Sequence, residues 1–335
     1  MTNPEHEHAE HSRPDPAFWG GRTVAVTGGA GFLGRPVVQL LTDVEADVRV
    51  IRSAEHDLRE KEQAFAALEG ADVIIHLAAR VGGIGFNRSN PAPLAYDNLT
   101  MGANVFEASR QLGASKLVAA CSVCAYPLHT EVPFREETIW EGYPEPSNAP
   151  YGLAKKMLLV LSDTYRRQYG FDSCAPVIAN LYGPCDNFDL EDSHVIAAMV
   201  RKFCEAAATG GEVTLWGSGE PSREFLYVDD AARAMVLCAE RLGTSEPVNI
   251  GAGRETRIRD LAEMIGSAAG FEGDVIWDAT RPDGQMKRGL DVSKARELLD
   301  FEAEVPLEQG LELTVDWYRS QAEGTGAVGT VVEPA

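Results

Sequence analysis

Short apolar runs alternate with longer amphipathic segments through the first 180 residues of the chain. Runs with strand-like composition occupy 23–27, 47–51, 72–76, 116–121 and 173–180. Segments with helical spacing separate them, and the two longest cover 90–112 and 149–169. Because parallel strands are joined through crossover helices, this alternation predicts an α/β fold, a Rossmann-like doubly wound parallel sheet.

The alternation ends after residue 180, where loops rich in Gly, Pro and Asn begin. A helix is expected near 193–208, followed by shorter mixed elements. We therefore expect a dinucleotide-binding domain and a smaller C-terminal substrate-binding lobe. The domain is predicted over 21–181 and 222–251, the lobe over 182–221 and 252–320, a disordered tail over 1–20 and a flexible tail over 321–335.

A glycine-rich turn, GGAGFLG, follows the first predicted strand and precedes a helix. Glycines in this position let the backbone approach a pyrophosphate at a helix N-terminus, where free N–H groups favour an anion. A glycine turn alone is weak evidence, but its place in an alternating β/α chain favours dinucleotide binding. The predicted contacts are Gly28, Gly31, Phe32, Leu33 and Gly34.

The end of the second predicted strand carries Arg52, with Arg59 close behind it. NAD enzymes usually place an acidic residue there for the ribose 2′-OH, whereas an Arg accommodates a 2′-phosphate. Arg52 therefore favours NADP(H), with a solvent-facing Arg as the alternative interpretation. Asp57 and Leu58 lie further along and are expected at the adenine edge.

The candidate chemistry lies in three later segments. Tyr151 and Lys155 are four residues apart, so a phenol and an ammonium share one helix face. A nearby ammonium is expected to lower the pKa of the phenol, and Ser122 is placed to orient the same substrate oxygen. Cys124 and His194 add a second acid/base pair, which predicts epimerisation beside ketone reduction.

Bland alternatives exist for the last two residues. A lone cysteine at a strand end is more often core packing, and a lone histidine before a helix is more often a cap. Cys121-x-x-Cys124 lacks the second ligand pair of a zinc site, and it ends a strand instead of opening a helix as a redox motif would. No metal is expected.

Composition is ordinary for a soluble globular protein, with 44% apolar and 24% charged residues in 335. Six cysteines without a disulfide framework indicate reduced thiols and a cytoplasmic enzyme. A net charge of −21 argues against nucleic acid and anionic membrane surfaces as partners. A phosphorylated substrate would then need a local cluster of cations.

Several segments are similar to those of the GDP-L-fucose synthases, NADPH-dependent 3,5-epimerase/4-reductases of the extended short-chain dehydrogenase/reductase family. VGGI and NLYGP-x-DNF are the most particular, and the resemblance covers about residues 22–320. The matching segments are HLAARVGGIGFN (76–87), SVCAYP (122–127), EPSNAPYGLAK (145–155), NLYGPCDNF (180–188), SHVIAAMVRKF (193–203), VTLWGSGEPSREFLYVDD (213–230), NIGAG (249–253), WDATRPDG (277–284) and LDVSK (290–294).

The resemblance implies roles for individual residues. The proton donor to the 4-oxygen falls on Tyr151, assisted by Lys155 and Ser122, and the epimerising base and acid fall on Cys124 and His194. The implied cofactor contacts include Ala78, Lys155, Asn180, Leu181 and His194. The implied substrate contacts are Lys202, Trp216, Arg223 and Asp283, with Lys287 and Arg288 as further cations for a diphosphate.

The implied enzyme is an NADP(H)-dependent homodimer acting on a GDP-linked 4-keto sugar. Departures from the family pattern are Cys185 for a loop His, Val123 for a Ser and Cys121 for a Gly. One alternative is a nucleotide-sugar epimerase with tightly held NAD(P) and no net reduction, similar to GDP-mannose 3,5-epimerase or acting on a longer GDP-sugar. Another is a non-catalytic nucleotide sensor, against which the intact Ser122, Tyr151 and Lys155 argue.

Overall fold

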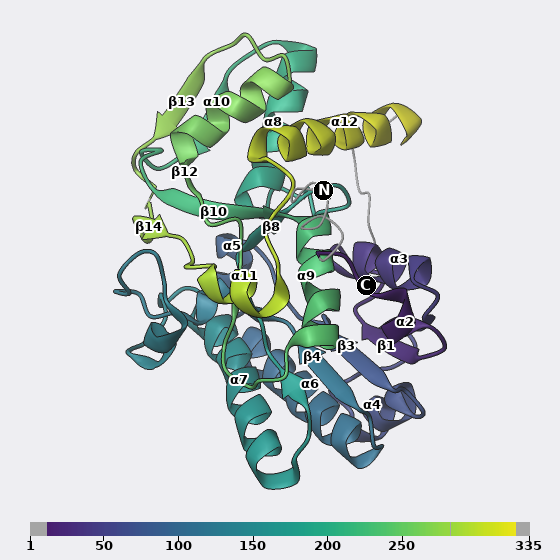
Figure 1. Cartoon of the computed structure of the whole chain (residues 1–335). Helices are drawn as coiled ribbons and strands as arrows, with labels where there is room; N and C mark the ends of the chain where they lie inside the picture. Colours follow the sequence, from purple (N-terminus) through teal and green to yellow (C-terminus); the bar gives the residue numbers. More distant parts are fainter. Residues whose placement is uncertain (1–11, 282, 326–335) are drawn as a thin grey trace, which may run out of the picture.

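The computed structural model describes residues 12–281 and 283–325 (Figure 1). Its main sheet is parallel and five-stranded, in the order β2-β1-β3-β4-β6. The strands are β1 (Thr23–Thr27), β2 (Asp47–Ile51), β3 (Val73–His76), β4 (Lys116–Ala119) and β6 (Ser173–Cys174). The predicted doubly wound α/β fold is confirmed.

The strand order reverses between β1 and β3. Val24, Ala25 and Val26 in β1 are fully buried, as expected for a strand covered on both faces. Ligands of doubly wound sheets bind outside the carboxyl ends of the strands at such a reversal. The glycine-rich turn after β1 and the segment after β3 therefore border the expected ligand crevice.

Two groups of helices cover the opposite faces of this sheet (Figure 1). One group is α3 (Gly34–Asp43) and α9 (Val228–Arg241), and the other is α4 (Lys61–Leu68), α6 (Pro91–Gln111) and α7 (Ala149–Tyr169). Both long helices carry a proline in the first turn, where its missing N–H costs no hydrogen bond. Gly170 ends α7 in the left-handed region, with φ of 67°.

Two predicted strands are wrong as single elements. Segment 173–180 divides into β6, β7 (Val177–Ile178) and the start of β8 (Asn180–Tyr182), and segment 116–121 divides into β4 and the start of β5 (Cys121–Ser122). Pro176 has no N–H for a ladder, and its carbonyl instead accepts the N–H of Cys121. β5, β7 and β11 (Asn249–Ile250) form a separate parallel sheet.

A second apolar core lies in the upper part of Figure 1 and includes Phe203, Leu261 and Val315. β10 pairs with β8, β12 and β14, while β9 pairs with β13. The elements here are α8 (Val195–Thr209), β9 (Val213–Trp216), β10 (Ser222–Tyr227), β12 (Glu255–Arg257), α10 (Ile258–Ala268), β13 (Val275–Asp278), β14 (Lys287–Arg288) and α12 (Leu307–Thr325). The domain boundaries drawn from the sequence stay a prediction.

The remaining short elements are α2 (Pro16–Trp19), α5 (Ile84–Ser89), η1 (Val123–Ala125), η2 (Glu136–Trp140) and α11 (Ser293–Leu299). α2 corrects the predicted N-terminal tail, because Trp19 is fully buried and its Nε1 donates to Glu240 at 2.5 Å. Residues 12–20 therefore pack onto the folded domain, and α12 continues to Thr325. Residues 1–11 and 326–335 of the predicted tails lie outside the described residues.

Within the ranges that the structure describes, no helix is both long and apolar enough to span a bilayer.

Candidate active site

Three of the predicted catalytic residues meet where β5, η1 and α7 converge. Ser122 ends β5, Cys124 lies in η1, and Tyr151 belongs to the first turn of α7. The Ser122 hydroxyl oxygen accepts the backbone N–H of Cys124 at 3.2 Å and is also hydrogen-bonded to the Tyr151 phenol. A hydroxyl, a thiol and a phenol thus form one cluster.

Gly152 permits this convergence. A Cβ atom at Gly152 would lie 2.2 Å from the backbone oxygen of Cys124, so any larger residue would push α7 away from η1. The glycine directly follows Tyr151, and the close approach therefore sets the position of the phenol relative to Ser122. The spacing of the Tyr-Gly-x-x-Lys segment serves both the helix face and this backbone contact.

Lys155 follows one turn after Tyr151 and is buried. Its Nζ lies 5.8 Å from the centroid of the Tyr151 ring. Burial lowers the pKa of Lys155 to about 8, which brings its proton within reach of exchange near neutral pH. The predicted pairing of phenol and ammonium on one helix face is confirmed.

The expected effect of this ammonium on the phenol is wrong. Burial of the phenol raises the pKa of Tyr151, and the neighbouring Cys124 and Cys121 act in the same direction. The hydrogen bond with Ser122 opposes this rise without reversing it. Burial therefore sets the direction of the shift, and Tyr151 carries its proton, which suits a proton donor.

His194 belongs to a separate segment, where it precedes α8 as an exposed N-cap residue. This segment is fixed to the VGGI loop, because the N–H of Gly83 donates to the oxygen of Asp192 at 2.6 Å. A Cβ atom at Gly83 would lie 2.4 Å from the oxygen of Ser193. The two family-specific loops thus pack together and place His194 at their junction.

Asp186 was missed as a candidate. It is 4% exposed, its Oδ2 has no partner among the described residues, and burial raises its pKa to about 6. The charge of His194 lowers that pKa, so the carboxyl and the imidazole lie within electrostatic reach. Asn87 Oδ1 and Ser193 Oγ are likewise buried without partners in the described part of the chain. The sequence feature that could have identified Asp186, Asn87 and Ser193 is their position in the segments shared with the family, 180–188, 76–87 and 193–203.

Two glycines of the glycine-rich turn lie where the backbone leaves no room for a side chain. A Cβ at Gly34 would lie 2.1 Å from the oxygen of Gly28, and one at Gly28 would lie 2.8 Å from the nitrogen of Ala78. The N-cap of α3 is Leu33, whose side chain makes no cap hydrogen bond. No side chain therefore caps the first turn of α3, in which the N–H of Arg35 donates to the oxygen of Gly31 at 3.0 Å.

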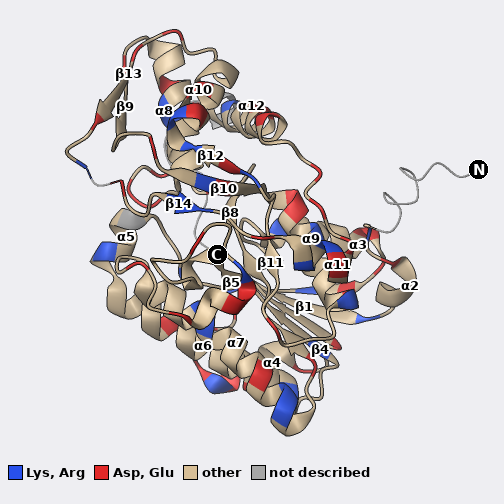
Figure 2. Ribbon diagram, turned by 60° about the vertical axis from the view of Figure 1, so that its left-hand side comes forward, with Lys and Arg blue, Asp and Glu red and all other residues tan. Residues whose placement is uncertain are grey.

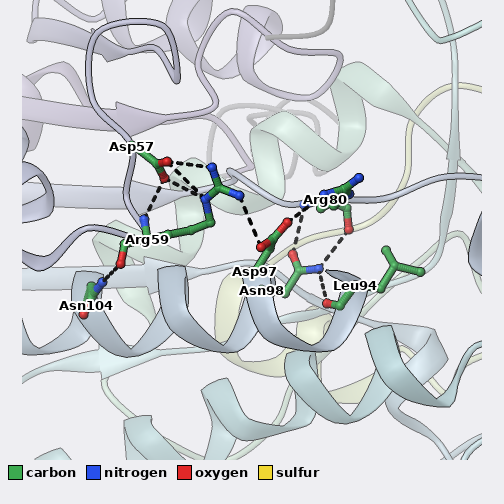
Figure 3. Close-up of polar contacts among 7 residues, drawn as sticks. All are labelled: Asp57, Arg59, Arg80, Leu94, Asp97, Asn98 and Asn104. Atoms are coloured by element: carbon green, nitrogen blue, oxygen red, sulfur yellow. Dashed lines mark hydrogen bonds and ion pairs between the residues drawn. The ribbon is translucent and has the colours of Figure 1, made fainter. Parts of the chain in front are cut away.

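Arg59 and Asp57 bind each other, as Figure 3 shows. The Arg59 side chain reaches Asp57 at 2.6 Å and Asp97 at 3.3 Å, and Arg80 reaches Asp97 at 2.9 Å. These carboxylates occupy the Arg59 guanidinium, whereas Arg52 is exposed at the end of β2.

Two other predicted cofactor contacts have partners inside the protein. Leu58 packs into the main core, and its backbone oxygen accepts from Asn104 at 2.9 Å. The Asn180 side chain donates to the oxygen of Glu224 at 2.8 Å, while Leu181 follows it in β8.

The predicted substrate contacts lie on or beside β9 and β10. Lys202 donates to the oxygen of Thr214 at 2.8 Å, and Trp216 is 58% exposed. Burial and the charge of Arg288 lower the pKa of Arg223 to about 10. Figure 2 shows basic residues on β10 and β14, the strands that carry Arg223, Lys287 and Arg288.

Asp283 has a different environment from the other three. Both of its oxygens accept from Ser218, at 2.7 Å from the backbone nitrogen and 2.8 Å from the hydroxyl. Its carboxylate therefore fixes the loop that follows β9. Among the described residues, no group of three His, Cys, Asp or Glu side chains is arranged to hold a metal ion.

Comparison with known proteins identifies the relatives. The model of the NAD dependent epimerase/dehydratase family matches residues 24–251. GDP-L-fucose synthase 1 of Arabidopsis thaliana is 39% identical over 299 residues, covering 88% of this chain and 92% of the relative.

Two solved structures share the fold. A GDP-L-fucose synthetase from Naegleria fowleri bound to NADP has a TM-score of 0.83 at 30% identity, covering 90% of this chain and 94% of that one. A GDP-6-OMe-4-keto-L-xylo-heptose reductase from C. jejuni has a TM-score of 0.85 at 25% identity, covering 90% and 98%. The chain belongs to the NAD dependent epimerase/dehydratase family, and within it to the GDP-L-fucose synthases.

Proposed function

We propose that this enzyme converts GDP-4-keto-6-deoxy-D-mannose to GDP-L-fucose, by epimerisation at C3 and C5 followed by reduction at C4 with NADPH. The observation that carries the proposal is the contact of Ser122, Cys124 and Tyr151. This cluster holds a carbonyl-directed proton donor and a second group that can move a proton at carbon. A simple ketone reductase needs only the first.

Epimerisation begins with the acidity of the carbon atoms beside the ketone. The 4-keto group acidifies the hydrogens at C3 and C5, because the electron pair left by deprotonation delocalises onto the 4-oxygen. Cys124, as thiolate, removes the proton, and His194, as imidazolium, returns one to the opposite face. The charge of His194 lowers the pKa of Asp186, so the carboxyl lies within electrostatic reach of the imidazole.

Reduction uses the same oxygen. Tyr151 and Ser122 stabilise the enolate by hydrogen bonding and later hold the ketone for reduction. Bound NADPH supplies the hydride for C4. Tyr151 then gives its proton to the 4-oxygen, and the buried Lys155, one helical turn away, provides an ammonium for its replacement. One pocket serves both half-reactions because both place negative charge on one atom.

We assign the cofactor to the crevice between β1 and β3. The backbone of Gly28 to Gly34 and the N-terminus of α3 are arranged for the pyrophosphate, and Arg52 for the 2′-phosphate. Lys202 and Arg223 supply cations for the GDP diphosphate. Lys202 lies within the predicted lobe over 182–221 and 252–320, and Arg223 lies at the border of that lobe. This local cluster offsets the repulsion expected from a net charge of −21.

We further propose a cytoplasmic homodimer. All six cysteines are free, which suits a reducing compartment. α6 and α7 pack together and carry exposed apolar side chains, with Tyr96 66%, Leu99 41% and Met157 40% exposed. Apolar groups gathered on two adjacent helices are typical of a protein interface. Four such helices across a twofold axis would cover them.

The first prediction separates the two chemistries. Cys124→Ser should stop solvent deuterium from entering the sugar at C3 and C5, because a hydroxyl is far less acidic than a thiol. His194→Gln should let part of the exchange survive, since deprotonation proceeds while delivery to the opposite face fails. Mass spectrometry of the sugar in D₂O measures both, and NADPH binding is the control for folding. Undiminished exchange in Cys124→Ser would remove Cys124 as the base.

The second prediction concerns cofactor choice. NADPH should bind at least about tenfold better than NADH, since a charge-assisted hydrogen bond contributes about 1.5–3 kcal/mol, and Arg52→Ala should abolish most of this preference. Lys61→Gln, which removes an exposed cation from α4, should leave the ratio unchanged. Fluorescence titration with each nucleotide measures the ratio. A wild-type enzyme that prefers NADH contradicts the assignment.

The third prediction concerns assembly. The protein should sediment at micromolar concentration with twice its chain mass of 36.2 kDa. A charge at the interface costs desolvation, so Leu99→Glu combined with Met157→Glu should yield monomers. Ile276→Glu, at an exposed apolar position on β13, is the matched control and should remain dimeric. A single-chain mass for the wild type excludes the dimer.

A further inference from the structure

The thiol of Cys124 accepts a hydrogen bond from a buried guanidinium. Arg288 Nη1 lies 3.6 Å from Cys124 Sγ, and Arg288 is only 8% exposed. The two residues come from distant segments, because Cys124 lies in η1 and Arg288 in β14. The sequence placed Arg288 with the diphosphate contacts, whereas the structure also brings it to the group assigned as the base.

The orientation of this guanidinium is fixed from the other side. Arg288 Nε and Nη2 both donate to Gln285 Oε1, at 3.3 and 3.1 Å. Gln285 Nε2 in turn donates to the backbone oxygen of Leu128 at 2.9 Å. Gln285 thus holds two donor groups of the planar fork and leaves Nη1 directed at Cys124.

The surrounding charges favour an anion at the sulfur. β10 and β14 pair in parallel register, which puts Arg223 opposite Arg288, and burial and the charge of Arg288 lower the pKa of Arg223. Cys124 opposes that shift, as do Glu255 and Asp283.

Both of those carboxylates are already engaged. Glu255 accepts from the hydroxyl of Ser222 at 2.5 Å, and Asp283 accepts from Ser218. Tyr151 faces Cys124 from α7 and keeps its proton, so it brings no charge of its own. Cys124 is therefore the acceptor that Arg288 Nη1 contacts, beside a pair of neighbouring guanidiniums, Arg223 and Arg288.

We propose that Arg288 holds Cys124 as the thiolate that abstracts protons from the sugar, and that Gln285 is the positioning residue for Arg288. This inference rests on the proposed function, in which Cys124 is the epimerising base. After each abstraction the proton is on sulfur and the electron pair is on the substrate 4-oxygen. The guanidinium then favours loss of that proton to solvent, which restores the base before the second carbon reacts.

Thiol alkylation tests the inference without any substrate. We expect iodoacetamide to modify Cys124 of the purified full chain at pH 7 at least about tenfold more slowly in Arg288→Gln, because the thiolate is the reactive species. Peptide mass spectrometry separates Cys124 from Cys185, the other partly exposed thiol, which serves as internal reference. Lys287→Gln removes an exposed cation from the same strand and should alkylate at the wild-type rate.

Two further variants keep the test decisive if Arg288→Gln fails to fold. Arg288→Lys retains the charge and should recover most of the rate, whereas Gln285→Leu retains every charge but frees the fork and should slow Cys124 about threefold. A wild-type rate of Cys124 alkylation in Arg288→Gln overturns the proposal. If Arg288→Gln does not fold, a wild-type rate in Gln285→Leu overturns it. Equal slowing by Lys287→Gln overturns it too, because the effect would then be general electrostatics.

The outcome is distinguishable from failure of the proposed function. Slow alkylation in Arg288→Gln together with undiminished deuterium exchange in Cys124→Ser would support the ion pair between Arg288 and Cys124, and would exclude Cys124 as the epimerising base. Loss of deuterium exchange in Cys124→Ser with unchanged alkylation in Arg288→Gln would support Cys124 as the base and exclude the proposed role of Arg288.

Discussion

The backbone contact between α7 and η1 is the constraint on which the site depends. Because Gly152 lets the helix approach the oxygen of Cys124, the phenol of Tyr151 meets Ser122 directly. The same contact brings the thiol and the phenol to one place, so the proton donor and the proposed base share a substrate oxygen. A side chain at residue 152 would push α7 away from η1, and the phenol of Tyr151 would then move away from the thiol of Cys124.

The site also depends on two titratable groups whose pKa values are shifted by burial. Lys155 loses part of its preference for the proton, while Tyr151 keeps its own more firmly. On the other side, Arg223 and Arg288 bring two guanidiniums into a protein of net charge −21. An anion is favourable there, in agreement with the proposed thiolate and the proposed position of the GDP diphosphate.

Much of this was predictable from the sequence, for physical reasons. Apolar periodicity correctly predicted the bounds of β1, β2 and α7, because buried positions repeat at a regular spacing along a helix or strand. Periodicity could not foresee the division of segment 173–180 at Pro176, where strand partners change between sheets. Trp19 was also missed, since one buried residue in a polar segment leaves no pattern.

The site was predicted in its residue types but not in its electrostatics. Spacing placed Tyr151 and Lys155 together, yet the direction of the Tyr151 pKa depends on desolvation, which only the packed structure gives. Neither the contact of Arg288 with Cys124 nor the pairing of Arg59 with Asp57 follows from spacing, since both depend on which side chains the fold brings together.

The most direct measurement is incubation of the enzyme with GDP-4-keto-6-deoxy-D-mannose and NADPH, followed by NMR of the product and the absorbance of the cofactor. We expect GDP-L-fucose with one NADPH oxidised per sugar in the wild-type enzyme, and neither product formation nor NADPH oxidation in Tyr151→Phe. An epimerised ketone that accumulates with NADPH intact, or a reduced sugar without inversion at C3 and C5, would contradict it.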